Sequence, residues 1–309
     1  MCATETIHLS IPKPYAFATS VCDHGWPALT PFYWDEPTQT LARVERLSSG
    51  QVVLLHLRAK AQHRQVQLQI AIDSVEPLSG TDRAEVVQAV RWMLKLDCDY
   101  EEFYALASHH KRIGRVVGEG RGRLLRSPTL WEDVVKTIAT TNVTWRNTVS
   151  MIHRLVDTLG APFPIDPTKR AFPTPQQVAA ASPVLFADTI RMGYRNAYVQ
   201  QLAQEIATGQ RDLETLKTSA LPTAELKKSL KSLKGIGDYA AHTLLMLLGH
   251  YGELPIDSEY RTFVARHYFG RGDSGEGDGG RNPTDQELAA VYDDWGQWKY
   301  LAYWFDHYD

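Results

Sequence analysis

The sequence predicts an α+β protein with an N-terminal antiparallel β-sheet lobe and a mostly α-helical C-terminal domain. Short alternating segments, separated by turn residues, continue through Asp73, whereas helix-length apolar patterns dominate from Pro128 onward. The chain has 309 residues, which is long enough for two lobes and a large core. We therefore expect one domain over residues 1–115 and a second over residues 116–309.

The first lobe contains several segments with the alternation of strands. The clearest is 64–73, where Val66, Leu68, Ile70 and Ile72 alternate with glutamines. This pattern predicts a sheet with one buried and one solvated face. Similar segments, separated by turn residues, occur at 4–11, 26–34, 39–47 and 51–58.

Helical patterns follow the sheet and dominate the second half of the chain. They cover residues 15–22, 83–95, 101–110, 130–140, 143–159, 175–190, 197–208, 212–218, 223–233, 260–268, 284–295 and 298–307. Thr174-Pro175 is a helix start signal, with Thr174 as N-cap and Pro175 in the first helical position. Residues 114–122 are glycine-rich and basic, which predicts a flexible connector.

The chain is organised around the motif between Leu230 and Asp257. Two helical patterns meet at Gly235-Ile236-Gly237, and Asp257 follows twenty residues after Gly237. The two glycines allow a sharp turn and a close approach of the backbone to a ligand. The unpaired amides that begin the second helix suit a phosphate. Positive charge surrounds the turn, from Lys227, Lys228, Lys231 and Lys234. Taken alone, the motif has an ordinary alternative, which is two packed helices with Asp257 as a cap.

Composition limits the classes of function. The formal net charge is −3, so any binding to a polyanion would depend on local basic patches and not on the field of the whole protein. Three cysteines, Cys2, Cys22 and Cys98, are widely separated and lack the spacing of a zinc or iron–sulfur site. We expect no metal and no cofactor.

The expected cellular location rests on two features of the sequence, the N-terminal residues and the length of the apolar segments. The first ten residues do not have the basic and apolar regions of a signal peptide, and no apolar run is long enough to span a bilayer. We expect a cytoplasmic protein, associated with the nucleoid if the source is bacterial.

The stretch Leu230 to Asp257, with the lysines around its Gly-Ile-Gly turn and with its Pro-Ile-Asp, resembles the helix-hairpin-helix, Gly-Pro-Asp superfamily of DNA base-excision glycosylases. The resemblance extends from about Arg123 to about Tyr268. A sheet lobe before the hairpin is similar to the 8-oxoguanine glycosylases and the bacterial 3-methyladenine glycosylase II type. Endonuclease III and the adenine-mismatch glycosylases lack that lobe and usually carry an iron–sulfur cluster.

The resemblance implies how the hairpin and the acid act. The hairpin grips a backbone phosphate of double-stranded DNA, with Lys231, Lys234, Gly235 and Gly237 as the DNA-binding residues. Asp257 lies at the mouth of a pocket that receives a flipped-out base. Cleavage of an N-glycosidic bond builds positive charge on the sugar, so one carboxylate can stabilise the transition state and assist water.

The junction between two helical patterns at residues 140–145 provides a further candidate. The resemblance implies that this turn enters the minor groove and that Asn142 fills the gap left by the flipped nucleotide. The alternative is that Asn142 simply caps the following helix.

Tyr239 occupies the position at which bifunctional members of the family carry a Schiff-base lysine. Because a phenol cannot form an imine, we expect a monofunctional enzyme. Tyr239 is either a packed aromatic or a wall of the substrate pocket, and Trp145, Tyr303 and Trp304 are further candidate stackers. Glu259 is interpreted as a helix N-terminal charge.

We therefore predict a monomeric DNA glycosylase of base excision repair that flips and hydrolytically releases a damaged or modified base, with an alkylated purine favoured. A base that carries positive charge is a good leaving group and needs little catalysis. Two alternatives are a bifunctional oxidised-purine glycosylase and lyase, with an amine such as Lys228, and a non-catalytic hairpin protein that only binds DNA.

Overall fold

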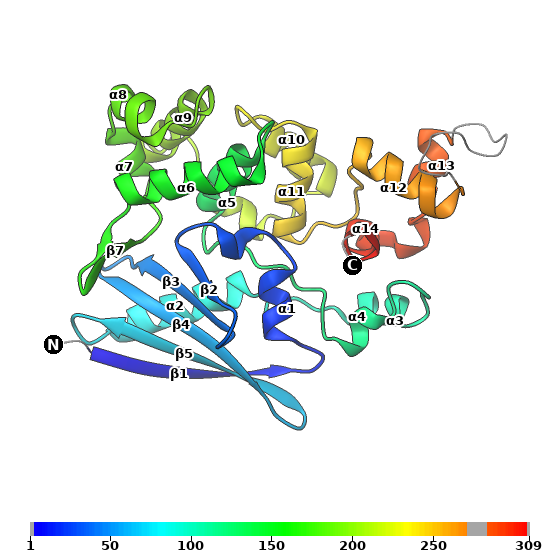
Figure 1. Ribbon diagram of the computed structural model, residues 1–309, viewed down its shortest axis with the longest axis horizontal. Helices are drawn as coiled ribbons and strands as arrows, with labels where there is room; N and C mark the ends of the chain where they lie inside the picture. The colour runs from blue at the N-terminus through cyan, green and yellow to red at the C-terminus, as the bar shows by residue number, and fades with distance from the viewer. Residues whose placement is uncertain (1–2, 271–282, 308–309) are drawn as a thin grey trace. The chain divides into compact units, whose positions relative to one another are not determined.

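The computed structural model describes residues 3–270 and 283–307 (Figure 1). The chain separates into two compact units. The first comprises residues 1–98, 119–220 and 233–235, and the second comprises residues 99–118, 221–232 and 236–309. Cys2 lies outside the described residues. The predicted domain boundary after residue 115 stays a prediction.

The first unit contains a five-stranded antiparallel sheet with the strand order β1-β5-β4-β3-β2 (Figure 1). Its strands are β1 (Ala3–Pro12), β2 (Phe32–Asp35), β3 (Thr40–Arg46), β4 (Val52–Ala61) and β5 (Gln65–Ser74). The apolar residues of β5 are buried as their alternation predicts, with Leu68, Ile70 and Ile72 fully buried. The predicted α+β class and N-terminal antiparallel sheet are confirmed.

The expected strand over residues 26–34 is mostly wrong. Trp26–Ala28 forms a 3-10 turn, η1, and only residues from Phe32 onward join the sheet as β2. Pro27 lies in the first turn of η1, and Pro31 directly precedes β2. Proline has no amide hydrogen to donate to a neighbouring strand, which accounts for the short strand. A short helix, α1 (Phe17–Cys22), precedes η1.

The two faces of the sheet are covered by different elements. Helix α2 (Gly80–Met93) lies behind the sheet in Figure 1 and buries Val86, Val90 and Met93. A hairpin of β6 (Pro162–Phe163) and β7 (Asp166–Arg170) was not predicted. Its Phe163 packs with Val44 and Leu54 and covers one end of the opposite face.

The helical part of the first unit follows the sheet in sequence. It consists of α5 (Leu130–Thr140), α6 (Trp145–Leu159), α7 (Pro175–Ala180), α8 (Pro183–Leu185), the π-helical turn η2 (Phe186–Ile190), α9 (Arg195–Ala207) and the 3-10 turn η3 (Glu214–Thr218). The predicted start at Thr174 is confirmed by a capping box with Gln177. The helix expected over 175–190 is interrupted because Ser182 and Pro183 begin a new turn.

A buried ion cluster joins the sheet to α5. Arg43 of β3 donates hydrogen bonds of 2.9 and 2.7 Å to the two carboxylate oxygens of Glu132. Lys136 Nζ lies 2.7 Å from Glu132, and Glu45 accepts from Arg43 Nε at 2.6 Å. The side chains of Arg43, Glu132 and Lys136 are at most 1% exposed, so their charges are neutralised by one another and not by water.

The second unit is helical. It contains α3 (Glu101–Ser108), α4 (Arg115–Gly118), α10 (Thr223–Lys231), α11 (Asp238–Leu248), α12 (Ser258–Tyr268), α13 (Asp285–Ala290), the 3-10 segment η4 (Asp293–Trp298) and α14 (Lys299–His307). The expected connector at 114–122 therefore contains one helical turn. The helix expected over 284–295 ends at Ala290, and Gly296 has φ +51° within η4.

Aromatic rings form the core of the second unit. Phe103 of α3 contacts the rings of Trp295, Trp298 and Phe305 at centroid distances of 5.6 to 6.3 Å. The Tyr100 hydroxyl lies 3.0 Å from the hydroxyl of Tyr251. These contacts hold the segment 99–118 against the C-terminal helices within this unit.

Candidate functional site

The predicted hairpin is formed by α10, a glycine turn and α11. Gly235 has φ +87°, and a Cβ at this position would lie 2.7 Å from the Tyr198 ring, so both the backbone and the packing require glycine. Gly237 is the N-cap of α11, and no side chain caps this end of the helix. A Cβ at Gly237 would meet no atom within 4 Å, so the approach to the first-turn amides is open to a phosphate oxygen.

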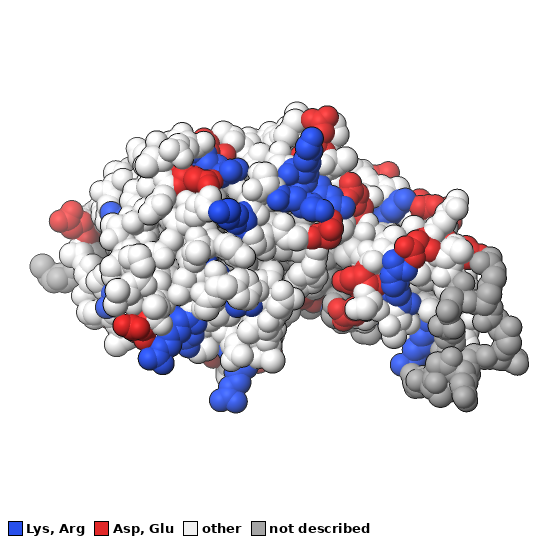
Figure 2. Space-filling model, turned by 90° about the horizontal axis from the view of Figure 1, so that it is seen from above, with Lys and Arg blue, Asp and Glu red and all other residues white. Residues whose placement is uncertain are grey.

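The lysines around the hairpin fall into two pairs. Lys227 is 2.8 Å from Glu253, and Lys231 is 2.7 Å from Asp238. Lys228 and Lys234 are exposed and form no ion pair in the described part of the chain. Figure 2 shows basic side chains gathered over α10 with acidic side chains beside them. Half of the predicted positive charge is therefore already neutralised by neighbouring carboxylates.

Asp257 is the N-cap of α12. Its Oδ1 accepts a hydrogen bond of 2.9 Å from the Tyr260 amide, which fixes the orientation of the carboxylate. Its other oxygen, Oδ2, accepts no hydrogen bond from any residue that the structure describes. Asp257 is only half buried, so solvent or substrate can reach it. The cap therefore uses one oxygen and leaves one acceptor for chemistry.

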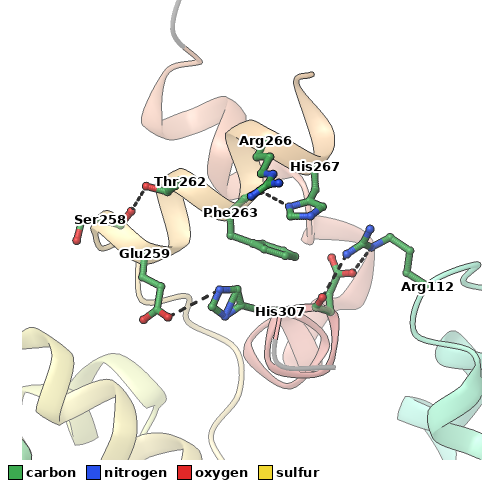
Figure 3. A pocket seen from close by; sticks show the side chains of 9 residues that line it. Arg112, Ser258, Glu259, Thr262, Phe263, Arg266, His267 and His307 are labelled. Atoms are coloured by element: carbon green, nitrogen blue, oxygen red, sulfur yellow. Dashed lines mark hydrogen bonds and ion pairs between the residues drawn. The ribbon is translucent and has the colours of Figure 1, made fainter. Parts of the chain in front are cut away.

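A polar pocket of about 560 Å³ begins at the residue after Asp257 (Figure 3). The lining residues come from α12, the end of α14 and the loop before α4, namely Arg112, Ser258, Glu259, Thr262, Phe263, Arg266, His267, Asp306 and His307. Two imidazole rings flank the buried Phe263 ring, with centroids 4.3 Å away for His267 and 4.6 Å away for His307. The pocket thus presents aromatic faces together with charged groups of both signs.

Glu259 has a more definite place than the sequence predicted. Its carboxylate lies 3.8 Å from His307 Nε2 across the pocket, as Figure 3 shows. Burial lowers the pKa of His307, while the neighbouring Glu259 and Asp306 act in the opposite direction. Asp306 is fully buried and accepts hydrogen bonds from Arg112 and from the Tyr292 hydroxyl.

The aromatic candidates have very different environments. The side chains of Tyr239, at the start of α11, and Trp145 are 51% and 44% exposed. The Trp145 ring lies against Gly25, where a Cβ would be only 2.8 Å from it. Tyr303 is 3% exposed and stacks on His307, one layer behind the pocket wall, whereas Trp304 is half buried. Their roles in substrate binding stay predictions.

The turn between α5 and α6 presents Asn142 to solvent with φ +47°. The capping alternative is wrong, because the N-cap of α6 is Thr144. Asn142 is instead exposed at the tip of a turn between two long helices, where a ligand can reach it.

Tyr194, directly before α9, is a residue that the sequence patterns did not single out. Its side chain is 53% exposed and hydrogen-bonds with the side chains of Asn142 and Thr141, which lower the pKa of Tyr194. The adjacent Arg195 is buried and donates to the carbonyl oxygens of Thr141 and Ile138. The signal was available as a Tyr-Arg pair directly after Gly193, outside the regular apolar pattern of α9.

The candidates belong to both units. Asn142, Trp145, Lys234 and Gly235 belong to the first unit, and Lys231, Gly237, Tyr239, Asp257, Tyr303 and Trp304 belong to the second. Among the described residues, no three His, Cys, Asp or Glu side chains are close enough together to hold a metal ion. No helix in that part of the chain is both long and apolar enough to cross a membrane.

The known proteins that this chain is similar to are DNA glycosylases. No protein-family model matches the chain. The DNA-3-methyladenine glycosylase of Bacillus subtilis (strain 168) is 23% identical over 246 residues, which cover 78% of this chain and 77% of that protein.

Solved structures of similar fold cover nearly the whole chain. The 3-methyladenine DNA-glycosylase of Archaeoglobus fulgidus has a TM-score of 0.71 at 19% identity, covering 98% of this chain and 97% of its own. The apo 8-oxoguanine glycosylase/lyase of Clostridium acetobutylicum has a TM-score of 0.72 at 16% identity, covering 100% and 98%. The clostridial enzyme is also known in complex with double-stranded DNA containing cytosine opposite 8-oxoG. These findings confirm the predicted resemblance to the DNA glycosylases and show that the chain shares the fold of solved glycosylase structures.

Proposed function

We propose that this chain removes a damaged base from double-stranded DNA by hydrolysing the N-glycosidic bond. The proposal rests on the hydrogen bonding of Asp257. One carboxylate oxygen caps α12 and so fixes the orientation of the side chain, while the other oxygen accepts no hydrogen bond from the described residues. Such a group is held in place by the fold and is still able to act on a substrate. The names of the relatives support the same chemistry.

The proposed reaction needs only a carboxylate and water. The bond between C1′ and the base nitrogen breaks, and its electron pair leaves with the base. The Asp257 carboxylate stabilises the positive charge that develops on the sugar. Water then attacks C1′ and gives its proton to the carboxylate, so the products are the free base and an abasic strand.

An alkylated purine is the favoured substrate. Alkylation that places positive charge on the base lets it leave as a neutral molecule, so a single carboxylate is sufficient. The Bacillus and Archaeoglobus proteins are both named for 3-methyladenine, which supports this class. The clostridial neighbour is named for 8-oxoguanine, so an oxidised purine is the second candidate.

The DNA contacts are proposed to come from the hairpin and from the turn at Asn142. The open amides at the start of α11 and the exposed Lys228 and Lys234 would hold a backbone phosphate. Asn142, braced by Tyr194, would enter the space left by the flipped nucleotide. The enzyme would act as a monomer on DNA, in the compartment that contains the DNA.

The absence of a lysine at position 239 favours simple hydrolysis over strand cleavage. A phenol cannot form an imine with C1′, so borohydride should trap no covalent complex with the substrate. The rival amine is Lys228, which is exposed and forms no ion pair in the described residues. Trapping that keeps pace with base release, and that disappears in Lys228→Gln, would establish the bifunctional alternative.

A panel of duplexes, each with one lesion, tests the proposal directly. Release of an alkylated purine, with strands that break only after alkali, is the expected result. Preferential release of 8-oxoguanine would replace the favoured substrate with an oxidised purine. Duplex binding without release of any base, under conditions in which a known glycosylase is active, would favour the non-catalytic alternative.

A further inference from the structure

A basic surface lies at one end of the five-stranded sheet, around the turn between β4 and β5. We call it the sheet-end surface, and its five exposed residues are Lys13, Arg58, Lys60, His63 and Arg64. The sequence contains no Asp or Glu between Glu45 and Asp73. The β4–β5 hairpin therefore carries no negative charge near its turn.

Strand pairing places amide side chains beside two of these cations. Lys60 lies opposite Gln67, and Arg58 lies opposite Gln69. Because side chains alternate along a strand, these four point away from the buried face of β5. The β6–β7 hairpin covers this face only at the end where Phe163 packs. The cations therefore stand on a polar face that is exposed at the turn.

Arg58 is held in place and still has donors to offer. Its Nε donates a hydrogen bond of 2.5 Å to the hydroxyl of Thr40 on β3. Its two terminal nitrogens form no hydrogen bond and no ion pair with the described residues. A guanidinium whose orientation is already fixed can bind an oxyanion through two parallel hydrogen bonds at a lower entropic cost.

The turn itself is ordered. The backbone amide of Gln62 donates to the carbonyl oxygen of Gln65 at 2.8 Å, and the side-chain amides of the same two residues are joined at 3.0 Å. His63 and Arg64 are the two residues between them, and both are exposed. Lys13 lies beside the turn, because it follows the last residue of β1, which pairs with Gln65. The positive charge at the turn is therefore presented by an ordered backbone.

The four cations of the sheet-end surface form no ion pair within the described residues. Asp35 and Glu36, at the turn between β2 and β3, accept hydrogen bonds from residues at that same turn. Asp73 is at the other end of β5, where it lies 3.4 Å from His56. The surface thus concentrates positive charge in a chain whose formal net charge is −3, and it should attract a polyanion.

The chemistry of the surface favours the phosphate backbone of DNA over an acidic protein or a membrane. Protein interfaces are centred on aromatic and apolar side chains, and membrane-surface segments insert apolar groups. None of the large apolar side chains exposed in the described part of the chain lies on this surface. Arg, Lys and amide side chains are the groups that contact phosphate and sugar oxygens.

We propose that the sheet-end surface binds the backbone of a second segment of double-stranded DNA. In Figure 1 the turn between β4 and β5 lies at the lower edge of the first unit, whereas α5 and α6 lie at its upper side. That this segment is a second one rests on the proposed DNA contact at the α5–α6 turn, but the attraction of DNA to the sheet end does not. A protein that holds two segments at once can pass from one to the other without release into solution.

Titration of the full chain with an undamaged duplex of about one and a half helical turns, at low salt, tests the proposal. We expect sedimentation to show two duplexes per wild-type chain, bound with different affinities. Lys60→Gln/Arg64→Gln should weaken the second binding event by about tenfold or more and leave the first unchanged. Arg46→Gln/Lys169→Gln is the matched control, because it removes the same charge from the same unit away from the β4–β5 turn, and it should still bind two duplexes.

The salt dependence of the second event provides an independent readout. Lys60→Gln alone should lower the slope of log K against log salt by about 0.9, as expected for one lost phosphate contact. Lys234→Gln, in the hairpin, should weaken the first event and leave the second unchanged. Since the substituted side chains are exposed, thermal unfolding should show all these variants to be folded.

Three results would overturn the proposal. One is a single duplex per wild-type chain, and another is an equal loss of the second event in Lys60→Gln/Arg64→Gln and in the matched control. The third is displacement of the second duplex by polyglutamate more readily than by DNA of equal charge, which would assign the surface to an acidic protein. No base is released in these measurements, so a second duplex can be found on a chain without glycosylase activity, and an active glycosylase that binds one duplex would refute this proposal alone.

Discussion

The buried cluster around Glu132 and the surface around Asp257 use carboxylates in opposite ways. Both oxygens of Glu132 accept from Arg43, and Lys136 adds a third contact, with all three side chains removed from water. Asp257 is half buried and uses one oxygen for a helix cap. The first arrangement has no capacity for a substrate, whereas the second does. In this protein, a carboxylate oxygen that accepts no hydrogen bond from the protein is therefore a better indicator of function than burial or charge alone.

The hairpin repeats this contrast among its lysines. Lys227 and Lys231 have carboxylate partners, and Lys228 and Lys234 have no ion pair in the described residues. The sequence places all four around one turn, yet the structure divides them into a pair that stabilises the hairpin and a pair that can meet a ligand. The predictions below test whether this division corresponds to a division between stability and function.

The largest expected effect is on stability, from Glu132→Gln. Loss of this carboxylate leaves Arg43 and Lys136 buried without their main counter-charge, and breaking a buried pair costs about 3–5 kcal/mol. Urea unfolding should show this loss, while the activity of the molecules that remain folded should change little. A loss below about 1 kcal/mol would mean that water or Glu45 replaces Glu132 easily.

The free energies of unfolding of the wild type and of Glu132→Gln should also depend differently on pH. Burial by itself would raise the pKa of Glu132, but Arg43 and Lys136 hold it at about 2, below the ordinary value of 4.5. A carboxyl whose folded-state pKa is lowered stabilises the protein above its unfolded pKa and loses that contribution as the pH falls. The difference in stability between wild type and Glu132→Gln should therefore shrink as the pH falls from 4.5 toward 2.

Asp257→Asn should have the opposite effects, with little change in stability and a large loss of base release. An Asn side chain still caps α12, so stability should be nearly unchanged. Loss of the negative charge against the sugar should slow base release by about 10²- to 10³-fold, with duplex binding kept within a few-fold. Single-turnover excision at saturating enzyme measures this. Wild-type excision by the variant would remove Asp257 from the mechanism and return it to the role of a cap.

Asn142→Ala tests the turn between α5 and α6. If Asn142 fills the gap left by the flipped nucleotide, the variant should release base from duplex about tenfold more slowly and from single strands almost normally. Tyr194→Phe removes the hydroxyl that hydrogen-bonds to Asn142 and should show the same pattern more weakly. Equal losses on both substrates would identify the turn as purely structural.

The sequence was sufficient for features that depend on local pattern. The alternation in β5, the capping box at Thr174 and the glycines of the hairpin each follow from short-range stereochemistry, and each is present. The strand expected at 26–34 is mostly absent, because the prediction followed the spacing of the apolar residues and gave too little weight to Pro27 and Pro31. The β6–β7 hairpin was missed because its strands are too short to show a period.

The parts that escaped prediction depend on residues distant in sequence. Glu259 was interpreted as an inconsequential helix charge, because its neighbour across the pocket, His307, is 48 residues away. The brace of Tyr194 on Asn142 likewise joins two separate loops. The neutralisation of Lys227 by Glu253 was also invisible, since a count of lysines does not say which of them have partners.

The smallest expected effects come from two hairpin lysines, Lys234 without an ion pair in the described residues and Lys231 paired with Asp238. Lys234→Gln should weaken binding to every duplex by a few-fold and lower the slope of log K against log salt by about 0.9, as expected for one lost phosphate contact. Lys231→Gln should change both quantities less, because Asp238 already neutralises Lys231 at 2.7 Å. Fluorescence anisotropy over a range of salt concentrations measures both. If the two variants lose affinity equally, the Lys231–Asp238 ion pair opens when DNA binds. Asp238→Asn should in that case tighten duplex binding, since it would free Lys231 and remove a negative charge from the phosphate site at the start of α11.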